Sequence, residues 1–221
     1  MEPEPRIEVE LRYRIMDRKS FLELERLETV GEYRLRPAGE RQMTDAYLDT
    51  PEQDLLVLGY ALRIRTVGKR KLLTLKSLTP PRDALHKRQE LETEVQGEDP
   101  RQWPAAAATS FLLPRLKGRA LETLCRVYQR RHRSLVSLGG REVFELSLDE
   151  VGFRPHGPAA LFELEVERIG EGSEEDLLCF GRLLEERFIL QPEPRSKFEL
   201  ALAERGIYLS LQPGTEPVEE R

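Results

Sequence analysis

Apolar and charged residues alternate along much of this chain, and the charged positions carry both signs. In residues 7–15 every second position is apolar, and the positions between them are Glu or Arg. A period of two predicts a β-strand whose two faces differ chemically. Short or alternating strand-like segments recur at residues 43–48, 61–66, 71–76, 87–95, 126–138, 141–149 and 161–167.

The connections between these segments predict an antiparallel meander. Gly68-Lys69-Arg70 and Gly139-Gly140 are turn sequences, and the second predicts a tight hairpin. We expect helices after Asp17, over residues 116–124, after Ser173 and from Ser196 to Gly206. Residues 34–41 are predicted to be a loop, and residues 98–114 a loop with a short helix. The organisation we expect is one domain over residues 1–211 and a polar tail over residues 212–221.

The charged strand faces have two structural solutions. An open antiparallel sheet with one solvated face gives this pattern. A closed sheet whose charged faces line a wet interior gives it too, provided that helices cover the apolar outside. The charged positions are Glu8, Glu10, Arg12, Arg63, Arg65, Lys76, Arg88, Glu90, Glu92, Glu94, Arg131, Arg133, Glu145, Asp149, Glu163, Glu165 and Glu167.

A closed interior of this kind has a definite chemistry. Acids two residues apart on a strand project side by side, and clustered carboxylates favour a divalent cation such as Mg²⁺ or Mn²⁺. Arginines at the same spacing grip phosphate oxygens. The combination predicts a site for a metal–polyphosphate complex.

Composition excludes several other classes. The net charge of −5 argues against general nucleic-acid binding. Cys125 and Cys179 form no CxxC pair, and the three histidines are isolated, so a zinc site is not expected. The start of the chain is acidic and polar, and the longest nearly apolar stretch, 104–114, is too short for a membrane span. We therefore expect a cytoplasmic protein without a membrane partner.

An ordered set of segments resembles the CYTH superfamily, the triphosphate tunnel metalloenzymes. The run Glu8-Val9-Glu10-Leu11-Arg12 is similar to the ExExK motif of that family. Further similar segments follow in the family's order, at residues 45–51, 59–65, 73–76, 85–90, 148–151, 162–167 and 196–199. The likeness covers roughly residues 6–205.

The resemblance implies an α+β fold, a closed eight-stranded antiparallel β tunnel with helices packed outside. Family members bind triphosphates with Mg²⁺ or Mn²⁺, and most hydrolyse inorganic triphosphate, thiamine triphosphate or nucleotides. Some are adenylate cyclases. Residues 85–90 are most similar to the bacterial inorganic triphosphatases, so inorganic tripolyphosphate is the substrate that the resemblance favours.

The resemblance also implies roles for individual residues. Glu8, Glu10 and Arg12 would be catalytic. The phosphate-binding set would be Arg63, Arg65, Lys76, Arg131, Arg133 and Lys197. The metal-binding set would be Glu8, Glu10, Glu163 and Glu165, with Asp149 near them. Arg130 has the opposite strand parity to Arg131, so a register shift by one residue would exchange the two.

Arg12 departs from the family motif, which has lysine at this position. Arginine keeps its charge and is no base, so turnover could be slow. Three functions follow: a metal-dependent triphosphatase, an adenylate cyclase, and a non-catalytic binder of polyphosphate or nucleotide. The expected partners are inorganic, nucleoside or thiamine triphosphates, and a homodimer is compatible with the sequence.

Overall fold

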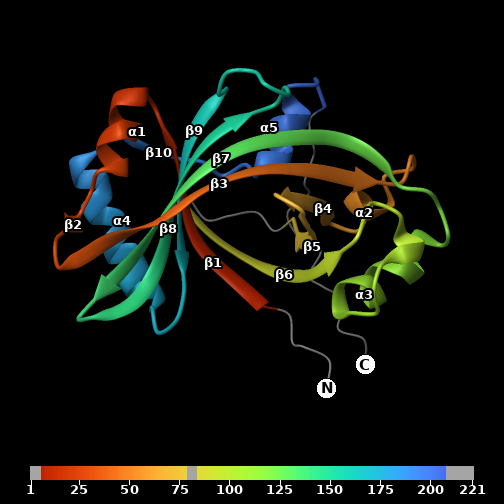
Figure 1. Ribbon diagram of the computed structural model, residues 1–221, viewed down its shortest axis with the longest axis horizontal. Helices are drawn as coiled ribbons and strands as arrows, with labels where there is room; N and C mark the ends of the chain where they lie inside the picture. Colours follow the sequence, from red (N-terminus) through yellow and green to blue (C-terminus); the bar gives the residue numbers. More distant parts are fainter. Residues whose placement is uncertain (1–5, 79–83, 208–221) are drawn as a thin grey trace.

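The computed structural model describes residues 6–78 and 84–207, and its main feature is an antiparallel sheet that closes on itself (Figure 1). Strand β1 pairs with β6 along its first half and with β9 along its second. The closed path is β1-β6-β5-β4-β3-β7-β8-β9. The eight strands are Arg6–Ile15 (β1), Tyr33–Asp49 (β3), Tyr60–Val67 (β4), Arg70–Ser77 (β5), Leu85–Val95 (β6), Glu122–Leu138 (β7), Arg141–Gly152 (β8) and Leu161–Arg168 (β9). The predicted eight-stranded tunnel is confirmed.

Two short strands extend the sheet outside this ring. Strand β2, Thr29–Val30, pairs with the start of β3. Strand β10, Leu190–Pro192, pairs with the end of β1 at Tyr13–Ile15. The added strand occupies the part of β1 that β6 leaves unpaired.

The helices are short and arranged around the sheet. They are Arg18–Glu25 (α1), Asp54–Val57 (α2), Ala107–Leu116 (α3), Glu174–Arg187 (α4) and Lys197–Ala203 (α5), with a 3₁₀ turn at Pro100–Gln102. Asp17 and Ser173 cap α1 and α4 through their side chains, as their sequences predict. Among the described residues, no helix is long and apolar enough to span a membrane.

Two apolar cores lie on the outer face of the sheet. One packs α1 and α4 over β1, β8 and β9, and the other packs α2 and α3 over β3 to β6 (Figure 1). Helix α4 approaches β1 closely at Gly181, where a Cβ atom would lie 2.5 Å from a methyl carbon of Leu11. Where these helices cover the sheet, the outward strand face is therefore a buried apolar face, which leaves the charged face for the interior.

Helix α5 packs differently from the other four. Phe198 and Leu202 contact a cluster that contains Tyr47, Ala61 and Val127. These three residues share strand faces with the interior residues Asp45, Arg63 and Gln129, because alternate residues of a strand point to the same side. Helix α5 therefore packs against the interior wall and brings Lys197 to the charged section.

Two predicted segments differ from the structure. Residues 34–41 were predicted as a loop, but they belong to β3, which accommodates Pro37 and Gly39 with an irregularity in its pairing to β7. Residues 116–124 were predicted as a helix, but the helix ends at Leu116 and β7 begins at Glu122. The predicted tail over residues 212–221 lies outside the described residues.

Candidate active site

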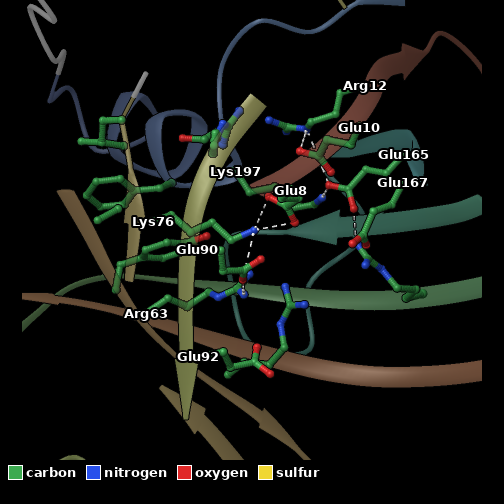
Figure 2. Close-up of a pocket in the computed structure, with 18 residues that line it drawn as sticks. Glu8, Glu10, Arg12, Arg63, Lys76, Glu90, Glu92, Glu165, Glu167 and Lys197 are labelled. Carbon is green, nitrogen blue, oxygen red and sulfur yellow. Dashed lines mark hydrogen bonds and ion pairs between the residues drawn. The ribbon is translucent and has the colours of Figure 1, made fainter. Parts of the chain in front are cut away.

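A cavity of about 190 Å³ lies inside the tunnel, with charged side chains on most of its wall. Figure 2 labels many of these residues, which come from strands on several sides of the barrel and, for Lys197, from α5. The charged residues that line it are Glu8, Glu10, Arg12, Arg63, Arg65, Lys76, Arg88, Glu90, Glu92, Arg131, Glu165, Glu167 and Lys197. They come from β1, β4, β5, β6, β7, β9 and α5.

One wall is organised around Lys76 of β5. Its ammonium group lies 2.8 Å from a carboxylate oxygen of Glu8 and 3.4 Å from one of Glu90 (Figure 2). Burial opposes ionisation of Glu8, but the charge and hydrogen bonds of Lys76, with the charge of Arg88, together outweigh burial and lower the pKa of Glu8 to about 2. Glu8 is therefore a carboxylate at neutral pH.

Glu10, two residues along β1, has the opposite behaviour. Its side chain is buried, and the nearest cation, Arg12, lies 3.9 Å away. Burial and the charges of Glu8 and Glu165 raise the pKa of Glu10 to about 8. The rise shows that negative charge is crowded here, which a cation would relieve.

A second wall is organised around Asp45 of β3. Its carboxylate accepts two hydrogen bonds from Arg65, both 2.8 Å long, and one of 2.7 Å from Gln129. Arg63 lies 3.5 Å from the same carboxylate. Burial opposes its ionisation, but Arg65 and Arg63 hold the pKa of Asp45 below its usual range. Asp45 thus fixes the two arginines that the sequence assigned to phosphate.

A third wall contains a group of acids. Carboxylate oxygens of Asp149, Glu163 and Glu165 lie within 4.8 Å of one another. Lys197 contacts all three, at 3.0 Å from Asp149. Arg131 binds Asp149 through two hydrogen bonds and also contacts Glu165, while Arg12 contacts Glu163. Hard oxygen donors at this spacing suit Mg²⁺ or Mn²⁺, so the residues present fit such an ion.

The structure gathers most residues that the sequence singled out. Nine of the predicted site residues line the cavity: Glu8, Glu10, Arg12, Arg63, Arg65, Lys76, Arg131, Glu165 and Lys197. Asp149 and Glu163 lie behind the lining, in contact with Lys197. Arg133 is not in the lining and binds Glu145 at 2.7 Å.

In β7, Arg131 points into the tunnel and Arg130 points outward, as the sequence predicts. Arg131 pairs with Asp149 inside the tunnel. Arg130 is half-exposed and binds Glu40 at 2.7 Å on the outside. The register shift considered for this strand does not occur.

Sequence reasoning missed four cavity residues and also Asp45, the acid that binds Arg65 and lies near Arg63. Arg88, Glu90, Glu92 and Glu167 line the cavity but were assigned no role. Their strand parity was visible in the sequence and was the available signal. Asp45 was noted only as part of a family-like segment, because its partners come from other strands.

Comparisons with known proteins agree with this geometry. A family model described as the CYTH domain matches residues 6–199. The structure is similar to HpAC1, a candidate adenylyl cyclase from Hippeastrum for which a dominant triphosphatase activity is described, with a TM-score of 0.67, 19% identity and coverage of 93% of this chain and 99% of that chain. It is similar to PH1819 from Pyrococcus horikoshii OT3, with a TM-score of 0.59, 23% identity and coverage of 90% and 99%.

A third similar structure is a candidate adenylate cyclase from Bacillus halodurans, with a TM-score of 0.55, 19% identity and coverage of 86% of this chain and 95% of that chain. A search of curated proteins found no match. At such low identities the structural likeness shows a shared fold, and the substrate must be argued from the site.

Proposed function

The chain belongs to the CYTH domain family, and on that premise we propose that it hydrolyses inorganic tripolyphosphate to pyrophosphate and phosphate in a divalent-metal-dependent reaction inside its tunnel. The observation that carries the proposal is the cavity wall, where cations and acids from six strands and α5 face one space. A linear polyanion with a bound metal ion needs both kinds of charge along its length.

The cations hold the substrate. Arg63 and Arg65 are fixed by Asp45, and Arg131 is fixed by Asp149, so their guanidinium groups are oriented before substrate arrives. Lys76 and Lys197 add two ammonium groups from other sides. Such pre-organisation favours charge that develops at the phosphoryl oxygens in the transition state.

The acids of the cavity would bind the metal ion, and one of them accepts a proton from water. Asp149, Glu163 and Glu165, with Glu8 and Glu10 on β1, the strand that pairs with β9, would hold Mg²⁺ or Mn²⁺. The chemistry that a bound divalent cation supplies is neutralisation of phosphate charge and activation of water. The water oxygen bonds to the terminal phosphorus, the phosphoanhydride bond breaks and pyrophosphate leaves. The water's proton goes to Glu10, which a bound cation would convert to its carboxylate by relieving the crowded negative charge.

The test is a phosphate-release assay on tripolyphosphate, ATP and thiamine triphosphate, each with Mg²⁺ and with Mn²⁺. We expect tripolyphosphate to be the best substrate, and Glu8→Ala and Glu10→Ala to lose release. Faster phosphate release from ATP or from thiamine triphosphate would show that this compound, and not tripolyphosphate, is the preferred substrate. Cyclic AMP formed from ATP would favour the cyclase, and the absence of any turnover would overturn hydrolysis.

A second function, binding without turnover, is supported by Arg12. Its side chain is 2% exposed and contacts Glu163, with Glu165 at 3.6 Å. The guanidinium is permanently charged and cannot accept a proton from water. If Arg12 prevents turnover, Arg12→Lys should gain phosphate release while both proteins bind tripolyphosphate in calorimetry.

A further inference from the structure

The cavity cations differ in whether an acid neutralises them. Seven cations line the cavity, and six of them lie within 4 Å of a carboxylate: Arg12, Arg63, Arg65, Lys76, Arg131 and Lys197. Arg88 of β6 is the exception within the part of the chain that the structure describes. A buried guanidinium without a carboxylate is costly unless something else compensates it.

Strand pairing explains why no carboxylate of the described residues lies within ion-pair distance of Arg88, although its charge still lowers the pKa of Glu8 from a longer distance. Glu8 lies directly opposite Arg88 in the pairing of β1 with β6. The Glu8 carboxylate is instead bound by Lys76, with oxygen–nitrogen distances of 2.8 and 2.9 Å. Arg88 is 9% exposed and its hydrogen-bond partner is the Nδ1 atom of His86, two residues along the same strand face.

The hydrogen bonds of His86 fix its tautomer. A guanidinium can only donate, so Nδ1 of His86 must be an acceptor. Nε2 lies 3.1 Å from the backbone oxygen of Glu193, which can only accept, so Nε2 carries the hydrogen. Both contacts require the same neutral form of the ring. His86 is 1% exposed, so the surrounding packing holds the ring in this orientation.

We propose that Arg88 binds a phosphoryl oxygen of the substrate and that His86 is its positioning residue. The inference rests on the proposed function for the identity of the ligand, a triphosphate. His86 Nδ1 holds the guanidinium, whose side chain lines the cavity. Among the described residues no carboxylate lies within 4 Å of Arg88, so an anion bound there breaks no ion pair of these residues, whereas binding at each of the other six cations competes with a carboxylate.

Calorimetric titration of tripolyphosphate in EDTA tests the pair without turnover. Arg88→Gln should weaken binding about tenfold to hundredfold, the range for a hydrogen bond to a charged group. His86→Leu removes the acceptor and should weaken binding about fivefold to tenfold. His86→Asn, whose side-chain oxygen can replace Nδ1, should restore most of the affinity. Lys87→Gln is the matched control, because this neighbour faces outward and binds Glu174.

A double variant separates positioning from a general structural effect. In the Arg88→Gln background, His86→Leu should cause no further loss of affinity, because its effect acts through Arg88. An equal loss in both backgrounds, or unchanged binding by Arg88→Gln, would overturn the proposal. Absence of binding by the wild type would overturn it as well. Phosphate release is assayed separately. If the wild type shows no turnover but the variants still weaken binding as expected, the proposed hydrolysis is refuted and the role of Arg88 in binding stands.

Discussion

At the scale of single residues, the interior is stable because nearly every buried charge has a partner of opposite sign. Asp45 is fully buried and binds Arg65 and Gln129, with Arg63 within 3.5 Å. Removing one member of such a group leaves the others desolvated and uncompensated. The interior charges therefore affect folding as well as ligand binding.

Asp45→Asn should be strongly destabilising. The change leaves Arg63 and Arg65 without their shared anion, and we expect a loss of about 3–5 kcal/mol in the free energy of unfolding. Urea denaturation measures this loss. Glu94→Gln is the control, since its pair with Arg70 is exposed and its loss should cost far less stability. Equal effects of the two variants would contradict the role of burial.

Glu10 predicts a pH dependence of stability in the metal-free protein. Its pKa rises from an ordinary value of 4.5 to about 8 in the folded state, so between these values the folded protein binds the extra proton. The contribution of Glu10 to the free energy of unfolding is therefore largest below pH 4.5 and is lost as the pH rises to about 8. The loss is at most about 1.4 kcal/mol per pH unit. Denaturation at pH 5–8 should show this slope, and Glu10→Gln should remove it.

At the scale of elements, the sequence predicted strands best where one face is apolar. Strands β1, β4 and β9 were found because packing on the outside and charge on the inside impose a period of two. The first half of β3 lacks this constraint, since most residues from Arg36 to Gln42 are exposed. Its Pro37 and Gly39 then suggested a loop. Helix α3 agrees with the short helix predicted within residues 98–114, whereas the separate helix predicted over residues 116–124 is absent, because α3 ends at Leu116 and β7 begins at Glu122.

For the candidate site too, the sequence predicted what depends on the local pattern and missed what depends on distant contacts. Parity alone indicated which charged residues share the interior. It could not show which acid binds which base, because these partners are set by strands far apart in sequence. The case of Glu8 is typical: it lies opposite Arg88, yet it binds Lys76 of β5.

Helix α5 makes a prediction about the acidic group. Its first residue, Lys197, follows the Ser196 cap, and Ser196 and Glu199 form a capping box that fixes the helix start. The Lys197 ammonium group lies among Asp149, Glu163 and Glu165, where a divalent cation would bind. Lysine and metal therefore compete for the same oxygens.

Lys197→Met should raise the affinity of the protein for Mn²⁺ at least about tenfold in the absence of substrate, because a competing charge is removed. Electron paramagnetic resonance of free Mn²⁺ measures this affinity independently of activity. Arg133→Met is the control, since Arg133 binds Glu145 and not the three acids. Unchanged or weaker Mn²⁺ binding by Lys197→Met would show that the ammonium group does not occupy the ion's position.

At the scale of the whole molecule, the site exists only when the barrel is closed. Glu8 and Glu10 lie on β1, whose pairing with β9 completes the ring, and the facing cations come from β4, β5 and β7. Among the residues that the structure describes, no single hairpin or half of the barrel carries all the acids and cations that line the cavity. A ligand that contacts both should therefore bind the folded barrel and not a partly unfolded chain.

This linkage predicts how the substrate changes thermal stability. With Mg²⁺ and tripolyphosphate at about 100 times its dissociation constant, binding adds about 2.7 kcal/mol to the free energy of unfolding. For a domain of this size the melting temperature should rise by about 5–10 °C, in a single transition. Glu8→Ala should reduce the shift, since the cavity loses an acid that would help to hold the metal ion. Sulfate at equal ionic strength is the control: if it gave the same shift, the effect would be general anion screening, and the closed barrel would not be the binding unit.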